Sequence, residues 1–277
     1  IAEGVENSNF FLETRAGRFI LTIFERRVRA EDLPFFMAVK AHLADRGIPC
    51  PAPQPTKTGA LTAVVAGKPC AIVSFLNGVS PKRPTAGQCQ AIGQMLGKMH
   101  LALADFPGQR ANTLGPLAWR GLISPRMEAA ENLAPGLARA IAEDLDRLEQ
   151  TWPQDLPQGV IHADLFPDNA LLLGDQVGGV IDFYFACTDA LAYDLAVCLN
   201  AWCFEPDRSF NLTKSRALLS GYQGVRPLSA AEQAALPTLA AGAAMRFFAT
   251  RLADWAATPP GALVRPKDPM DYAHRLA

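Results

Sequence analysis

The sequence predicts a bilobed α+β fold, in which a small antiparallel-sheet lobe precedes a larger, mostly helical lobe. The first 76 residues contain two pairs of β-rich runs, each joined by a short turn that carries glycine. Helical periodicity dominates after Asn77-Gly78. The chain has 277 residues, 49% hydrophobic and 19% charged, which is enough apolar material to build a core in both lobes. We therefore expect a small unit at 1–76 and a larger unit at 77–277.

Two β-hairpins are expected in the first unit. Residues 9–14 and 18–24 are β-rich and are separated by three residues that end in Gly17, which can adopt the positive φ of a tight turn. Residues 61–65 and 69–76 flank the turn sequence Ala-Gly-Lys in the same way. The first lobe therefore reads as β-β-α-β-β, with a helix between the hairpins.

That helix is predicted over 31–46, because its apolar residues recur at close to helical period and Gly47 follows as a stop signal. The second lobe begins with helical patterns and contains a short β segment at 159–161, followed by further helices from residue 190 onward. The helices expected before that segment cover 86–104, 119–134 and 137–152.

Charge and composition exclude several classes of protein. Lys and Arg number 26 and Asp and Glu 27, so the net charge is −1 and no basic field favours nucleic acid or an anionic membrane surface. The apolar runs are too short or too interrupted to span a bilayer. The six cysteines form no C-x-x-C pair, which predicts reduced thiols in a cytoplasmic protein. The first residue is Ile1, and we expect the native start to lie upstream.

The most informative segment is 159–185, GVIHADLFPDNALLLGDQVGGVIDFYF. It contains His162-Ala163-Asp164, then Asn169 after four intervening residues, and Asp182 at the end of an apolar run. This is the H-x-D-x-x-x-x-N spacing of a kinase catalytic loop with a downstream D-F. A carboxylate such as Asp164 can accept the proton of an alcohol nucleophile, whereas Asn169 and Asp182 offer the oxygen ligands that Mg²⁺ prefers.

Local context favours this interpretation over a merely structural one. A β run precedes the loop, and the strands expected at 171–173 and 177–181 form a hairpin that brings Asn169 close to Asp182. In the structural alternative, Asp164 and Asp168 only cap a turn. His162 is interpreted as a residue that shapes the loop through packing and hydrogen bonds, in preference to a proton carrier.

The loop resembles that of the aminoglycoside-phosphotransferase-like kinases, whose fold is similar to that of protein kinases. The string HADLFPDN, the following GVIDFYFACTDALAYDLAVCLNAWCFE and the N-terminal Gly4-Val5-Glu6-Asn7-Ser8-Asn9-Phe10 resemble the homoserine kinases within that family. The resemblance implies a bilobed protein-kinase-like fold that binds ATP near a hinge at 76–79, uses Mg²⁺ and phosphorylates L-homoserine in threonine biosynthesis. It implies that Asp164 is the catalytic base and that Asn169 and Asp182 hold the metal.

One position departs from the kinase pattern. Kinases of this fold place a lysine on the third strand to contact the phosphates, but the matching residue here is Thr22, whose hydroxyl carries no charge. Either the loop near Gly4 and the metal carry more of the phosphate charge, or a nearby arginine such as Arg18 reaches the phosphates. Backbone N–H groups near Gly4 and the Asn7 side chain are candidate phosphate donors, although the loop alone also fits an ordinary turn.

Homoserine has a carboxylate, an ammonium and a primary hydroxyl, so its pocket requires charged partners. Arg246 and Arg251 lie on one predicted helix and could bind the carboxylate, or could equally form structural ion pairs. Tyr184 and Trp202 follow the metal-binding segment and are expected near the acceptor, as are Asn200 and Asp189. Asp194 is expected to brace the catalytic loop through backbone hydrogen bonds.

Two other functions remain open on the sequence alone. The acceptor could be an aminoglycoside or choline, although neither a strongly acidic cleft nor an aromatic cage is evident. The chain could also be a pseudokinase that binds nucleotide without phosphoryl transfer, as Thr22 would allow, but such a loss would more naturally remove Asp164 or Asp182. The oligomeric state is not predicted.

Overall fold

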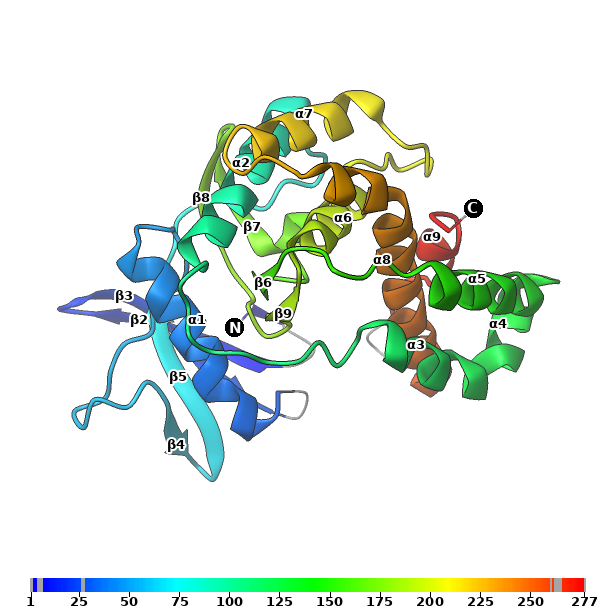
Figure 1. Ribbon diagram of the computed structural model, residues 1–277. Helices are drawn as coiled ribbons and strands as arrows, with labels where there is room; N and C mark the ends of the chain where they lie inside the picture. Colours follow the sequence, from blue (N-terminus) through cyan, green and yellow to red (C-terminus); the bar gives the residue numbers. More distant parts are fainter. Residues whose placement is uncertain (1, 4–6, 26–27, 260, 262–265, 277) are drawn as a thin grey trace.

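The N-terminal part of the chain forms an antiparallel sheet with the strand order β1-β2-β3-β5-β4. The computed structural model describes residues 2–3, 7–25, 28–259, 261 and 266–276, and all strands and helices named below lie within these ranges. The strands of this sheet are β1 (Ala2–Glu3), β2 (Asn7–Thr14), β3 (Gly17–Phe24), β4 (Ala63–Val65) and β5 (Lys68–Ser74). Figure 1 shows the sheet and helix α1 (Leu33–Asp45) on one side of the molecule and most helices on the other. The predicted bilobed α+β arrangement is confirmed.

Both predicted hairpins are present, and their turns explain why the chain reverses there. Gly17 has a φ of 135°, which a residue with a Cβ rarely adopts. In the second hairpin, Ala66 and Gly67 have φ values of 51° and 76°, the pair of positive angles that a two-residue turn between twisted strands requires. The resulting register places Thr22 opposite Asn9 on one side and Ala71 on the other.

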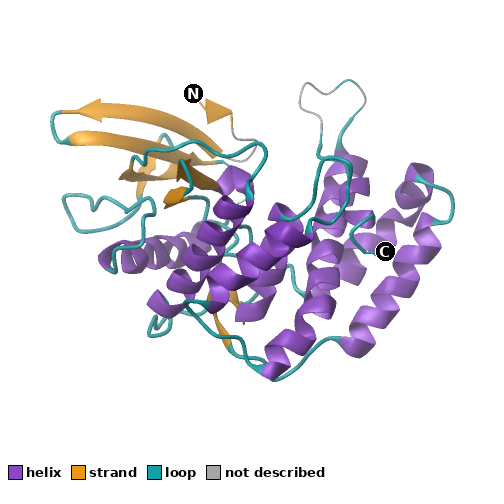
Figure 2. Cartoon of the chain, turned by 90° about the horizontal axis from the view of Figure 1, so that it is seen from above, coloured by secondary structure: helices purple, strands orange, loops and turns teal. Residues whose placement is uncertain are grey.

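The second part of the chain is mostly helical, as Figure 2 shows from above. The prediction of one helix over 119–134 is wrong, because the 3-10 turn η2 (Ser124–Arg126) divides this segment into two helices. Pro125 lies in this turn, and a proline has no N–H for an α-helical hydrogen bond. The helices are α2 (Ala86–Ala102), α3 (Pro116–Ile123), α4 (Met127–Leu133), α5 (Leu137–Thr151), α6 (Leu191–Trp202), α7 (Leu212–Gln223), α8 (Ala230–Ala257) and α9 (Met270–Ala273).

Helix α1 joins the sheet to this helical part. It follows the 3-10 turn η1 (Ala30–Asp32) and ends shortly before Gly47, whose φ is 75°. Its buried face includes Phe36, Met37 and Leu43, and these side chains belong to the same hydrophobic core as Trp202 of α6. A shared core of this kind fixes the position of α1 relative to α6.

Four short strands frame the segment that carries the predicted motif. Strand β6 (Gln158–Ile161) includes the predicted β segment at 159–161. It pairs with β9 (Cys187–Ala190), a strand that was not predicted from the sequence. Strand β7 (Ala170–Leu173) pairs with β8 (Gln176–Val180) and follows the 3-10 turn η3 (Pro167–Asn169). The predicted hairpin after Asn169 is therefore confirmed. None of the helices in the described part of the chain combines the length and hydropathy that crossing a bilayer requires.

Candidate active site

Residues 162–169 of the motif lie on a loop between β6 and β7, Asp182 follows β8, and both segments contain a strained residue. Ala163 has a φ of 63° and Asp182 a φ of 64°, and both are non-glycine residues in the left-handed region. Such a conformation persists only where surrounding contacts hold it in place. The contacts that hold this loop come from α6, from α8 and from His162 within the loop.

Asp194, on α6, accepts hydrogen bonds from the loop backbone. Its Oδ2 accepts the N–H of His162 over 2.7 Å, and its Oδ1 accepts the N–H of Ala163 over 2.8 Å. The fully buried carboxylate also lies 3.1 Å from Nε2 of His100 on α2. Burial alone would raise the pKa of Asp194, but the hydrogen bond and charge from His100, with the contribution of His162, hold its pKa below the usual value. Asp194 is therefore an ionised anchor for the loop.

His162 connects the loop to the segment that leads to Asp182. Its Nε2 lies 3.0 Å from the carbonyl oxygen of Ile181, and its Nδ1 accepts the N–H of Asp164 over 3.2 Å. This pair of contacts assigns the proton to Nε2. Burial lowers the pKa of His162, so the ring is neutral at pH 7. The imidazole can hold two backbone groups at once, in keeping with the shaping role inferred from the sequence.

Asp164 is half-buried at the centre of this arrangement. Nδ2 of Asn169 donates to the Asp164 carbonyl oxygen over 2.8 Å and to its Oδ2 over 3.0 Å. Burial raises the pKa of Asp164 to about 7, and the charge of Asp182 acts in the same direction while Arg246 opposes it. A carboxylate with such a pKa is suited to accept a proton near neutral pH.

Asn169 and Asp182 are brought together by the backbone. The N–H of Ile181 donates to the carbonyl oxygen of Asn169 over 2.9 Å, and Asp182 follows with an exposed side chain. Because Nδ2 of Asn169 is directed at Asp164, its Oδ1 remains available, and no hydrogen bond from another described residue reaches it. An amide oxygen and a carboxylate fit Mg²⁺, which takes its remaining ligands from phosphate and water. The described residues contain no cluster of three or more His, Cys, Asp or Glu side chains suited to a metal.

The predicted phosphate-binding residues are only partly visible. Gly4 lies outside the described residues. Oδ1 of Asn7 is buried and receives no hydrogen bond within the described part of the chain. Thr22 is 4% exposed, and its hydroxyl donates to Oδ1 of Asn9 over 2.8 Å. Thr22 is therefore a packed strand residue with no charge to offer.

Sequence reasoning missed Lys40, a buried cation on α1. Lys40 is only 2% exposed, and its Nζ lies 5.1 Å from the centre of the Tyr184 ring. The signal was available, because Lys40 follows Phe36 by four residues and Met37 by three, which places it on the apolar face of the helix. Burial lowers the pKa of Lys40 to about 8, although Cys50 and Asp182 act in the opposite direction.

The expected acceptor residues are engaged in other contacts. Tyr184 packs edge-on against Phe24 and Phe36, between the sheet and α1. Trp202 is 1% exposed and donates from Nε1 to the Leu165 carbonyl oxygen over 2.7 Å. Both side chains support the site from within the core.

The two predicted arginines are also occupied. Arg246 is 2% exposed, and its Nη1 donates to the carbonyl oxygen of Ala163 in the catalytic loop. Arg251 donates to the carbonyl oxygen of Asp268 over 2.9 Å and pairs with Asp271 at 3.1 Å. Asn200, a further expected residue, donates to the Ala240 carbonyl oxygen over 2.8 Å and so links α6 to α8.

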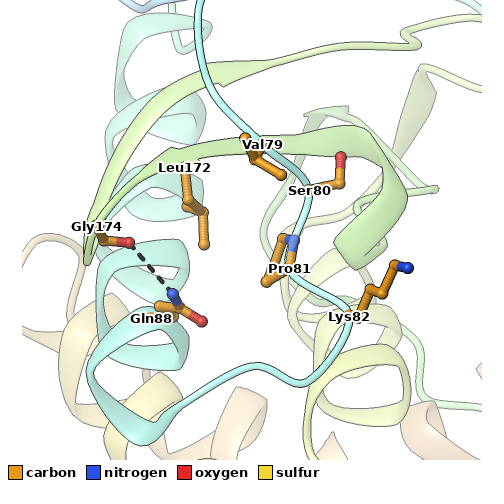
Figure 3. Close-up of a pocket in the computed structure, with 7 residues that line it drawn as sticks. All are labelled: Val79, Ser80, Pro81, Lys82, Gln88, Leu172 and Gly174. Atoms are coloured by element: carbon orange, nitrogen blue, oxygen red, sulfur yellow. Dashed lines mark hydrogen bonds between the residues drawn. The ribbon is translucent and has the colours of Figure 1, made fainter.

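A surface pocket of about 500 Å³ lies beside the catalytic loop (Figure 3). It is formed by the segment that follows the predicted hinge, together with residues of β7 and α2, and Ser80 on its rim donates to the carbonyl oxygen of Asp168 over 3.2 Å. Asp164, Asn169 and Asp182 are not among its lining residues, so it adjoins the motif without containing it. The lining residues are Val79, Ser80, Pro81, Lys82, Gln88, Leu172 and Gly174.

Comparisons with known proteins find relatives in sequence and in fold. Two homoserine kinases, from Xanthobacter autotrophicus and Rhodopseudomonas palustris, are 60% and 58% identical to the chain, cover all of it and are themselves covered to 86% and 85%. An amicoumacin kinase structure has a TM-score of 0.71 at 17% identity, with 99% of this chain and 85% of that chain covered. A choline kinase from Cryptosporidium parvum has a TM-score of 0.66 at 17% identity, covering 100% and 85%. The latter two show the kinase-like fold.

A model of the phosphotransferase enzyme family matches residues 1–228, which include both the sheet and the complete motif. With the relatives above, this match shows that the chain belongs to the phosphotransferase enzyme family.

Proposed function

We propose that this protein is a homoserine kinase, which transfers the terminal phosphoryl group of ATP to the side-chain hydroxyl of L-homoserine with Mg²⁺ as cofactor. The observation that carries the reaction type is the convergence of Asp164, Asn169 and Asp182 through the hydrogen bonds of the catalytic loop. The acceptor follows from full-length similarity to homoserine kinases at 55–60% identity.

Asp164 is the proposed general base. Asn169 occupies its Oδ2, which leaves Oδ1 for the hydroxyl of the acceptor. As the new O–P bond forms and the bond from phosphorus to the leaving ADP oxygen breaks, the hydroxyl proton passes to Asp164. Burial keeps the pKa of Asp164 at about 7, so the carboxylate is a stronger base than a solvated aspartate.

Asn169 and Asp182 are the proposed protein ligands of the metal. Mg²⁺ held there would offset part of the negative charge of the phosphate oxygens and help to orient them for in-line transfer. The chain's own contribution is to hold the two ligand side chains beside Asp164. His162 and the Ile181 backbone fix this relationship by hydrogen bonds.

ATP is proposed to lie between a nucleotide lobe at 1–76 and a catalytic lobe at 77–277, with the adenine close to the hinge at 76–79. Asn7 stays a candidate phosphate donor through Nδ2 of its side-chain amide, as predicted from the sequence. Gly4 stays a prediction from the sequence. Thr22 is proposed to support this end of the sheet through Asn9 and to make no ionic contact with phosphate.

We do not propose that the acceptor is bound by Tyr184, Trp202, Arg246 or Arg251, because these side chains already make the contacts described above. Lys267 is a better candidate for the carboxylate of homoserine. Its side chain is 66% exposed, its Nζ lies 3.6 Å from Oδ2 of Asp168, and its charge acts on Asp164. An exposed ammonium at this place can exchange a weak surface ion pair for a substrate carboxylate.

The cytoplasm is the proposed location, since all six cysteines are buried free thiols, as expected in a reducing compartment. A coupled assay of ADP release tests the proposed activity. Homoserine-dependent release supports a homoserine kinase, release that depends on an aminoglycoside or choline supports a kinase of another alcohol, and ATP binding without release with any of these alcohols supports the pseudokinase alternative.

A further inference from the structure

The chain lacks a cation where kinases of this fold usually place one. A triphosphate carries a concentrated negative charge that Mg²⁺ only partly offsets, so a lysine on the third strand normally contacts it. Here the strand offers Thr22, which is buried and hydrogen-bonded to Asn9. Some other side chain must supply the positive charge if the enzyme binds ATP in the usual way.

Arg18 is poorly placed for that role. It lies four residues before Thr22 on β3, a separation of about 13 Å along a strand. Its Nη2 donates to Oδ1 of Asn77 over 3.2 Å, and its guanidinium lies 5.1 Å from the centre of the Phe75 ring. These contacts hold Arg18 at the hinge end of the sheet, beside Phe75 and Asn77.

Lys40 is placed differently. Its Nζ lies above the ring of Tyr184, two residues after Asp182, and the charge of Asp182 acts on it. The charge of Asp182 in turn acts on Asp164. Lys40 is therefore close enough to Asp182, and Asp182 to Asp164, for their charges to interact, and the phosphates of ATP are expected to lie beside these two carboxylates.

The ammonium of Lys40 also lacks a carboxylate ion-pair partner within 4.0 Å among the described residues. Its position over an aromatic face offers a partial substitute, since the ring quadrupole attracts a cation. Burial of an ammonium without a close anion is nevertheless unfavourable. The arrangement is readily explained if an anionic ligand completes it.

We propose that Lys40 contacts the phosphates of bound ATP and supplies, from helix α1, the positive charge that Thr22 cannot supply from strand β3. This inference rests on the proposed kinase function. It assigns a phosphate-binding role to a residue that the sequence motif does not include.

The test compares Lys40→Met and Lys40→Arg with Lys98→Met, a control on the exposed face of α2. Equilibrium binding of Mg-ATP and of adenosine is measured by calorimetry without acceptor, and kinetics are measured with homoserine. Lys40→Met should weaken Mg-ATP binding about tenfold or more and leave adenosine binding within twofold. The value of kcat/KM for ATP should fall about 10²-fold, and Lys40→Arg should recover part of both.

The melting temperature separates phosphate binding from a purely structural role. Under the proposal, Lys40→Met should keep or raise the melting temperature, because Met is apolar, similar in length and removes a buried charge. Replacement of a lysine that only stabilises the fold would lower the melting temperature instead. Equal affinity of Lys40→Met and wild type for Mg-ATP would overturn the proposal, as would parallel losses of ATP and adenosine binding. If Lys40→Met fails to fold, Lys40→Gln is judged by the same ratio of affinities. Because binding is measured without acceptor, failure of homoserine as substrate leaves this result interpretable.

Discussion

The carboxylate of Asp194 accepts the backbone N–H of Ala163 over 2.8 Å and so connects the first turn of helix α6 to a left-handed residue of the catalytic loop. On the other side of the same residue, Arg246 of α8 donates to the Ala163 carbonyl oxygen. The residue before Asp164, the proposed base, is therefore held by charged side chains at both its backbone N–H and its carbonyl oxygen. Asp164 is thus positioned by the helical core and not by the loop alone.

Asp194→Asn should destabilise the protein by about 2–4 kcal/mol, because one of two buried acceptor oxygens becomes an NH₂ group that faces an N–H donor. The lowered pKa of Asp194 implies that its stabilising effect is present above pH 3.8 and is lost as the pH falls through the lower folded-state value. Urea unfolding at several pH values checks this. His100, His162 and Cys198 also face the carboxylate, and they are present in both wild type and variant.

The free-energy difference between wild type and Asp194→Asn should thus be largest near neutral pH and shrink below pH 3.8. Asp146→Asn serves as a control, since Asp146 is 63% exposed and its pair with Arg120 contributes little. A constant difference across the whole pH range would contradict the ionised state assigned to Asp194.

The sequence predicted those features that local signals determine. Both N-terminal hairpins depend on turn residues such as Gly17, and the catalytic loop depends on the spacing from His162 to Asn169. Long-range contacts were less accessible. Trp202 reads as a plausible acceptor residue in sequence, but whether it faces a pocket or Leu165 depends on how α6 packs.

The same limit explains why Lys40 and His100 were missed. Each is a single polar residue on an apolar helix face, and its meaning comes from a partner far along the chain. His100 meets Asp194 94 residues later, and Lys40 meets Tyr184 across the junction between α1 and the segment after β8. A buried polar residue on a helix predicts that a hydrogen-bonding partner exists, but it does not show which residue that partner is.

Asp164→Asn should reduce homoserine-dependent turnover by about 10³-fold, because the amide cannot accept the hydroxyl proton. Mg-ATP affinity should change by less than a few fold. Burial raises the pKa of Asp164 to about 7. At pH 8 the folded state therefore holds an ionised, half-buried carboxylate, which destabilises it relative to the unfolded state. The variant should therefore melt at a higher temperature than wild type at pH 8 in EDTA. Steady-state kinetics and calorimetry measure the three effects, and retained turnover would remove Asp164 from the role of base.

Gly93→Ala should destabilise the protein by about 3 kcal/mol or more, because α2 and α7 approach too closely for a side chain. A Cβ at Gly93 would lie 2.0 Å from the carbonyl oxygen of Leu218, and one at Gly221 would lie 2.1 Å from that of Gln90. Gly121→Ala on α3 is the matched control, since a Cβ there meets nothing within 4 Å. The control should gain about 0.5–1 kcal/mol from reduced backbone entropy. Equal stability of the two variants would contradict the helix packing.

Lys267→Met should raise the KM for homoserine about tenfold, which corresponds to about 1.4 kcal/mol of lost interaction with the substrate carboxylate. The KM for ATP should stay within twofold, because Lys267 lies beside Asp168 and the ring of Phe166 on the catalytic-loop side. Lys57→Met, at an exposed site before strand β4, controls for the loss of one positive charge. The amino alcohol 3-aminopropan-1-ol, which keeps the primary hydroxyl and the amine of homoserine but has no carboxylate, provides a second measure. If Lys267 binds that carboxylate, the wild-type preference for homoserine over this amino alcohol should collapse in Lys267→Met, whereas an unchanged preference would place the carboxylate elsewhere.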